Sequence, residues 1–101
     1  MNKLENRREE TVIKDKFLAT IEVTDYYGIK TREVELIVDR GKLPTIGNYI
    51  DLFREKYELE TEIKDIPMME FRVKNPEPKG IRMLRARRLV KDYTYTPVTK
   101  I

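Results

Sequence analysis

The chain of 101 residues contains no cysteine and no histidine. The absence of cysteine excludes disulfides, thiolate metal sites, iron–sulfur clusters and thiol nucleophiles. The absence of histidine removes the usual proton shuttle at neutral pH and the commonest transition-metal ligand, which leaves carboxylate, lysine, tyrosine and hydroxyl chemistry. We therefore expect no bound cofactor, no metal and no enzymatic activity.

Glycine-rich loops and long apolar segments are missing as well. Each glycine-containing loop has a single glycine, so the chain has no phosphate-cradling fingerprint. No apolar run approaches the roughly 20 residues of a membrane span, and MNKLENRREETVIKDK alternates charges where a signal peptide needs an apolar core. These absences predict a soluble, cytoplasmic protein with no membrane partner.

The composition is that of a charge-rich chain that folds. Hydrophobic residues make up 40% and charged residues 39% of it, and 21 basic residues nearly balance 18 acidic ones. This balance separates the chain from disordered proteins of high net charge, and its length suits one domain. We expect residues 1–14 to form a flexible N-terminal arm and residues 15–101 to form a single α+β domain.

Two runs in the first half of the chain alternate apolar and polar residues, which is the pattern of half-buried strands. The first extends from Lys16 to Thr24 and the second from Glu33 to Asp39. Asp25-Tyr26-Tyr27-Gly28 between them supplies turn chemistry. Together they predict a β-hairpin.

A helix is expected after this hairpin. Gly41 and Pro44 end the second strand, and Thr45 is placed to cap the helix. The following apolar residues recur at helical spacing and form one stripe: Ile46, Tyr49, Ile50, Phe53 and Tyr57. Such a stripe is what a helix needs to cover one face of a sheet.

The second half of the chain predicts another hairpin. A short strand is placed near Ile63, and Met69, Phe71 and Val73 alternate with charged residues. The return arm, residues 81–91, alternates imperfectly and is rich in good helix formers, so a helix competes with a strand there. The glycine-containing loop before it and the Tyr-Thr-Tyr-Thr segment after it favour the strand.

The predicted fold class is α+β with two layers. An antiparallel β-sheet of four to five strands, in the order ββαββ, packs one helix on one face. The other face of the sheet is left for solvent or for a partner.

Positive charge is concentrated near the C-terminal end of the chain. Residues 72–101 hold nine lysines and arginines against Glu77 and Asp92, a balance of +7, whereas residues 1–71 hold twelve against sixteen acids, a balance of −4. A concentrated basic surface attracts phosphate polymers and gains free energy by releasing their counterions. The last hairpin is therefore the predicted footprint for a polyanion.

The sequence predicts a small, basic nucleic-acid-binding module, for DNA or RNA, whose contacts are mainly with phosphate. Arginine suits bidentate phosphate contacts, and two tyrosines of equal parity are placed to stack on unpaired bases. The predicted nucleic-acid-binding residues are Lys79, Arg82, Arg85, Arg87, Arg88, Lys91, Tyr93 and Tyr95.

Two other interpretations remain open for the same basic segment. In one, the chain is an accessory or inhibitor protein whose basic hairpin docks on an acidic protein, or whose exposed edge strand pairs with another sheet to give a homodimer. In the other, the arginines only form ion pairs with acidic residues on the surface of the same domain.

Two further motifs have both a functional and a structural interpretation. Glu62-Ile63-Lys64 has the Glu-x-Lys spacing of metal-dependent nucleases, but in so charged a chain this spacing is expected by chance. Tyr26 and Tyr27 could anchor a partner at the first hairpin tip, although tyrosine at such a place more often folds back over the sheet edge.

Overall fold

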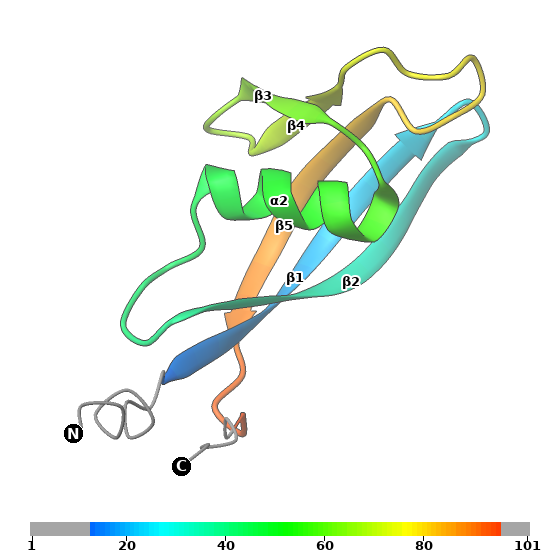
Figure 1. The fold of residues 1–101 in the computed structure, drawn as a ribbon. Helices are drawn as coiled ribbons and strands as arrows, with labels where there is room; N and C mark the ends of the chain where they lie inside the picture. Colours follow the sequence, from blue (N-terminus) through cyan, green and yellow to red (C-terminus); the bar gives the residue numbers. More distant parts are fainter. Residues whose placement is uncertain (1–12, 96–101) are drawn as a thin grey trace.

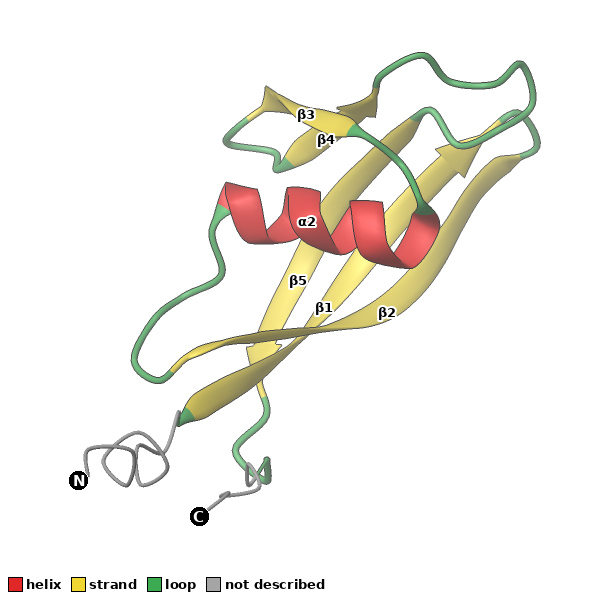
Figure 2. Cartoon of the chain, in the orientation of Figure 1, coloured by secondary structure: helices red, strands yellow, loops and turns green. Residues whose placement is uncertain are grey.

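A computed structural model describes residues 13–95 of the chain. Five strands form one sheet in the order β2-β1-β5-β4-β3, and all neighbouring strands are antiparallel. The elements in chain order are β1 (Lys14–Asp25), β2 (Gly28–Asp39), α2 (Ile46–Tyr57), β3 (Thr61–Asp65), β4 (Glu70–Val73) and β5 (Met83–Lys91). Figure 1 shows α2 lying across one side of this sheet, and Figure 2 separates α2 from the strands by colour. The predicted α+β class with one helix on one face is confirmed.

Strand β1 defines the two faces of the sheet. Its odd-numbered side chains from Phe17 to Val23 are buried under α2, and its even-numbered side chains are half-buried on the opposite side. We call these sides the helix face and the open face. Side chains directly opposite each other on paired strands share a face, so the register assigns residues of the other strands to one face or the other.

Local capping positions α2 over the helix face. The Thr45 hydroxyl accepts from the Asn48 N–H (3.1 Å), and the Asn48 side chain accepts from the Thr45 N–H (2.8 Å), which together form a capping box. The buried ring of Phe53 packs edge-to-face on Phe71 of β4, with 5.2 Å between ring centroids. The predicted Thr45 cap and apolar stripe are confirmed.

Strand β4 begins one residue later than the alternating pattern indicates. Met69 has a φ of 51°, and its N–H donates to the Ile66 carbonyl at 3.0 Å. A left-handed residue of this kind belongs to a turn rather than to a strand. Phe71 and Val73 are buried as the pattern predicts.

The return arm of the second hairpin is a strand, and a β-bulge explains its imperfect alternation. Thr20 of β1 pairs with Arg88. The next residue, Ile21, pairs with Ala86, so Arg87 is an extra residue with no partner on β1. One extra residue shifts the phase of a strand by one position. The arginines on either side of the bulge therefore reach the same face although their spacing is odd.

The predicted flexible arm, residues 1–14, lies outside the described residues except for Ile13 and Lys14. Of the predicted arm, Lys14 already belongs to β1, where its Nζ lies 2.7 Å from Oδ1 of Asp39. Within residues 13–95, no helix has the length and apolar character needed to cross a bilayer.

Candidate nucleic-acid interface

Three of the predicted arginines lie together on the open face. Arg85 is opposite Glu22, and Arg88 is opposite Thr20, both of which are open-face residues of β1. Arg87, in the bulge, places its guanidinium 2.5 Å from the Glu22 carboxylate and therefore points to the same side. The bulge thus gathers three guanidinium groups over the centre of the sheet.

Glu22 holds two of these arginines. Besides its contact with Arg87, its carboxylate lies 4.0 Å from the Arg85 guanidinium. Arg88 is exposed and forms no ion pair with any of the described residues. A phosphate approaching this surface meets one uncommitted guanidinium and two that share a single carboxylate.

The open face has a basic side and an acidic side. Across β3, β4 and β5 it carries five cations and three carboxylates, which are Lys64, Arg72, Arg85, Arg87, Arg88, Glu62, Asp65 and Glu70. Glu33 and Glu35 lie on the same face of β2, opposite Thr20 and Leu18 of β1. A polyanion is therefore attracted to the β5-β4-β3 side and repelled from the β2 edge.

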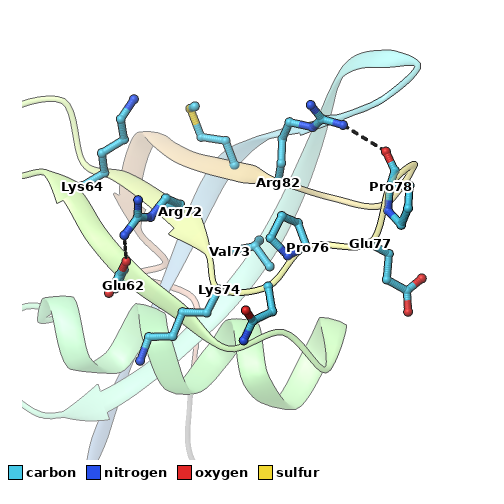
Figure 3. Close-up of a pocket in the computed structure, with 11 residues that line it drawn as sticks. Glu62, Lys64, Arg72, Val73, Lys74, Pro76, Glu77, Pro78 and Arg82 are labelled. Atoms are coloured by element: carbon cyan, nitrogen blue, oxygen red, sulfur yellow. Dashed lines mark hydrogen bonds and ion pairs between the residues drawn. The ribbon is translucent and has the colours of Figure 1, made fainter.

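A groove of about 720 Å³ runs between the basic side of the sheet and the loop of residues 74–82. Figure 3 shows the side chains of Lys64, Arg72 and Arg82 around it, with Arg72 bonded to Glu62. A guanidinium nitrogen of Arg82 donates to the Pro78 carbonyl at 3.1 Å, which ties the loop to the groove wall. The groove extends the basic surface beyond the three arginines of β5.

Lys91 and the two predicted stacking tyrosines do not join the other predicted residues. Lys91 is opposite the buried Phe17, so it lies on the helix face, where its Nζ is 3.3 Å from Asp15. Tyr93 lies with its ring 5.2 Å from Lys91, and Tyr95 lies 5.7 Å from the Lys16 amine. All three are near the end of β5 that is remote from the 74–82 loop (Figure 1).

Lys79 is near a different pair of tyrosines. Its Nζ lies 5.5 Å from the ring centroid of Tyr26, because the 74–82 loop passes beside the β1–β2 turn. The sequence did not predict the contact between Lys79 and Tyr26. The predicted nucleic-acid-binding residues also did not include Glu22, Lys64 and Arg72. The even-numbered position of Glu22 on β1 was an available signal, since that parity places it on the face opposite the core.

Asp15 is a nearly buried carboxylate at the edge of the helix face. Its Oδ2 accepts from the Gly41 N–H at 3.0 Å and lies 3.3 Å from the Lys91 amine. The Gly41 hydrogen bond, and then the Lys91 ion pair, lower the pKa of the Asp15 carboxyl below its usual value of 3.8. Asp15 thus anchors Lys91 away from the open face.

Replacing Asp15 by asparagine is expected to lower the free energy of unfolding at neutral pH and to have little effect in strong acid. The folded-state pKa of Asp15 is lower than the unfolded value of about 3.8, so its stabilisation is present above that pH and is lost as the pH falls through the folded-state pKa. Urea titrations of wild type and Asp15→Asn from about pH 7 down to about pH 2 measure this difference. Glu55→Gln is the control, because Glu55 is exposed on α2. A difference in the free energy of unfolding between wild type and Asp15→Asn that does not depend on pH would contradict the expectation.

No group of three carboxylates among residues 13–95 is placed to hold a metal ion. Glu62 is bonded to Arg72, and Lys64 lies 3.8 Å from Glu70. The Glu-x-Lys spacing therefore corresponds to two cross-strand ion pairs between β3 and β4.

Comparison of the chain with protein-family models, with curated proteins and with solved structures gives no significant match.

Proposed function

We propose that the protein is a non-enzymatic module that binds nucleic acid through phosphate contacts on the open face of its sheet. The observation that carries this proposal is the bulge in β5, which gathers Arg85, Arg87 and Arg88 on one face. Arginine forks bind phosphate oxygens in bidentate geometry, and such contacts are independent of base sequence. The groove lined by Lys64, Arg72 and Arg82 lets a bound strand continue across β4 and β3.

Salt dependence is the direct test of this proposal. For three phosphate contacts, the logarithm of the association constant should fall with the logarithm of salt concentration with a slope of about −2.7 for a duplex and about −2 for a single strand. Fluorescence anisotropy with labelled 20-nucleotide single strands and 20-base-pair duplexes, between about 50 and 200 mM salt, measures this slope. The absence of binding at the lowest salt, or binding that salt leaves unchanged, would reject the proposal.

Removing the charge of Glu22 is expected to tighten binding. Glu22→Gln frees Arg85 and Arg87 for phosphate and removes a carboxylate that repels it. We expect an affinity increase of about three- to tenfold at low salt, the size of one exposed charge interaction next to a phosphate contact. The same anisotropy titrations measure it, and Glu55→Gln on the helix supplies the same change of net charge away from the open face.

An equal effect of Glu22→Gln and Glu55→Gln would mean that net charge alone sets the affinity. A loss of affinity in Glu22→Gln would mean instead that Glu22 is needed to hold the arginines in a binding geometry. The first result would remove the open-face arrangement as the basis of binding, and the second would contradict the expectation that Glu22 opposes binding.

The outer edge of β2 favours a second candidate function, which is protein binding by strand addition. Within the described chain, β2 is paired only with β1. The carbonyls of Thr24 and Lys16 accept hydrogen bonds from the N–H groups of Arg82 and Asp92, which flank β5. The N–H and C=O groups of even-numbered residues of β1 therefore point toward β5 and away from β2. Their partners on β2 then direct N–H and C=O groups outward, as an edge open to another strand requires.

The β2 edge is suited to a second copy of the chain. Ile29 and Ile37 are 65% and 46% exposed on the open face, and they lie four residues on either side of Glu33. In an antiparallel two-fold pairing centred on Glu33, Ile29 of each copy would meet Ile37 of the other. Light scattering at increasing protein concentration tests this candidate. We expect Glu33→Gln to favour the dimer and Ile29→Lys to prevent it.

A further inference from the structure

Two exposed tyrosines stand at the turn between β1 and β2, where the fold itself does not require aromatic residues. The turn is held by the Asp25 carboxylate, which accepts from the N–H groups of Tyr27 (2.7 Å) and Gly28 (3.1 Å). Gly28 has a φ of 137°, which a side chain would strain, whereas neither tyrosine has a positive φ. Tyr26 and Tyr27 are 61% and 70% exposed, so burial does not explain them either.

The two rings have a defined arrangement with a cation beside them. Their centroids are 5.1 Å apart with an angle of 86° between the ring planes. The Lys79 amine lies 5.5 Å from the Tyr26 centroid, within the range of a cation–π contact. We call Tyr26, Tyr27 and Lys79 the aromatic tip. Figure 1 shows the β1–β2 turn beside the loop of residues 74–82, two segments that are distant in the sequence.

The aromatic tip is joined to the basic groove. The Arg82 N–H donates to the Thr24 carbonyl at 2.9 Å, one residue before the turn, and the Arg82 side chain lines the groove. Lys79 belongs to the same loop as the Pro76–Pro78 segment of the groove wall. The Asp25 carboxylate is hydrogen-bonded to the backbone of the turn, and Lys79 is the charged group that contacts the Tyr26 ring.

We propose that the aromatic tip is a base-stacking site for single-stranded nucleic acid, an inference that rests on the proposed function. The two rings are nearly perpendicular, so they do not offer two parallel platforms to one stack of bases. Tyr27 stacks on the face of one unpaired base. Tyr26 positions Lys79, through their cation–π contact, to bind the neighbouring phosphate. Aromatic stacking of this kind tolerates any base, because every base has a π face. A duplex keeps its base faces stacked inside and does not use the site.

Comparison of two polymers of equal charge tests the stacking site. The probes are a 20-nucleotide oligo(dT) and a 20-unit abasic deoxyribose phosphate strand, with anisotropy as the readout. We expect Tyr26→Ser/Tyr27→Ser to weaken binding of oligo(dT) about tenfold and to leave binding of the abasic strand nearly unchanged. Tyr26→Phe/Tyr27→Phe keeps the rings and should retain the wild-type affinity for both polymers.

Tyr93→Ser is the matched control. Tyr93 is 84% exposed and its ring lies 5.2 Å from a lysine amine, so it has the same local chemistry as the aromatic tip at a distant place. Its loss should leave oligo(dT) binding unchanged. Since the chain has no tryptophan, tyrosine emission is a second readout, and oligo(dT) should quench it in the wild type more than in the double serine variant.

The outcomes separate the stacking site from the wider proposal. If the double serine variant weakens both polymers equally, or neither, while the wild type binds both, the aromatic tip is not a stacking site and phosphate binding stands. If the wild type binds neither polymer at low salt, both proposals are overturned. Quenching of equal size in the wild type and the double serine variant would also overturn the assignment of stacking to the tip.

Discussion

Replacing Arg85, Arg87 and Arg88 together by glutamine is expected to weaken binding of nucleic acid roughly a hundredfold at about 100 mM salt. Each guanidinium that neutralises one phosphate adds about 0.9 to the slope of the logarithm of affinity against the logarithm of salt. On a duplex, the variant should therefore also lose most of a slope of about −2.7. Glutamine is preferable to glutamate, because a carboxylate at position 85 would face Glu22 and Glu70 and would destabilise the sheet.

A second triple variant separates position from net charge. Arg32, Lys42 and Lys56 are exposed cations in β2, in the following loop and on α2. Arg32 is opposite Ile21 and so belongs to the helix face. Arg32→Gln/Lys42→Gln/Lys56→Gln should change the affinity much less than the β5 variant does. Equal losses in the two triple variants would contradict a specific role for the open face.

Truncation of Phe53 to alanine is expected to cost about 3–5 kcal/mol of the free energy of unfolding. Phe53 is fully buried and packs against Phe71, Tyr49 and Tyr57, so its removal leaves a cavity between helix and sheet. Domains of this size are stabilised by about 5–15 kcal/mol in total, so the loss is a large fraction of the whole. Urea denaturation followed by circular dichroism measures it, by comparison of midpoints at an unchanged slope.

Lys56→Ala is the control for Phe53→Ala, since it places alanine in the same helix at an exposed position. Its effect should stay within about 0.5 kcal/mol. If Phe53→Ala were as mild as Lys56→Ala, the contact between α2 and β4 would not carry the core packing that the structure assigns to it.

The fold was largely predictable because its local signals agree. The alternation in β1 and β2, the turn at Asp25–Gly28 and the Thr45 cap each depend on neighbours a few residues away, and all are confirmed. The beginning of β4 was less predictable, because the left-handed Met69 is set by a turn hydrogen bond to Ile66. The arrangement of α2 on the sheet followed from its apolar stripe, which needs a matching apolar face.

The candidate site was harder to predict because its geometry depends on register. The sequence places basic residues along β5 but gives no sign of which one is the bulge, since that depends on pairing with β1. The contact between Lys79 and Tyr26 depends on how a long loop passes the first turn, and no short-range pattern encodes it. Conversely, Lys91 has the same charge as its neighbours in sequence, yet the phase of the strand directs it to Asp15 on the other face.

The bulge in β5 also bears on which length changes the strand accepts. Arg87 has no partner on β1. Its neighbours Ala86 and Arg88 pair with Ile21 and Thr20, which are consecutive on β1, so they face opposite sides of the sheet as consecutive residues of a regular strand do. Deleting Arg87, or the identical Arg88 next to it, therefore yields a strand in normal register in which Leu84 and Ala86 still face α2 and the remaining arginines still face outward. Deleting Val90 or inserting a residue at that point would instead exchange the two faces beyond it. We expect homologous chains that differ in length within β5 to differ at this pair of arginines.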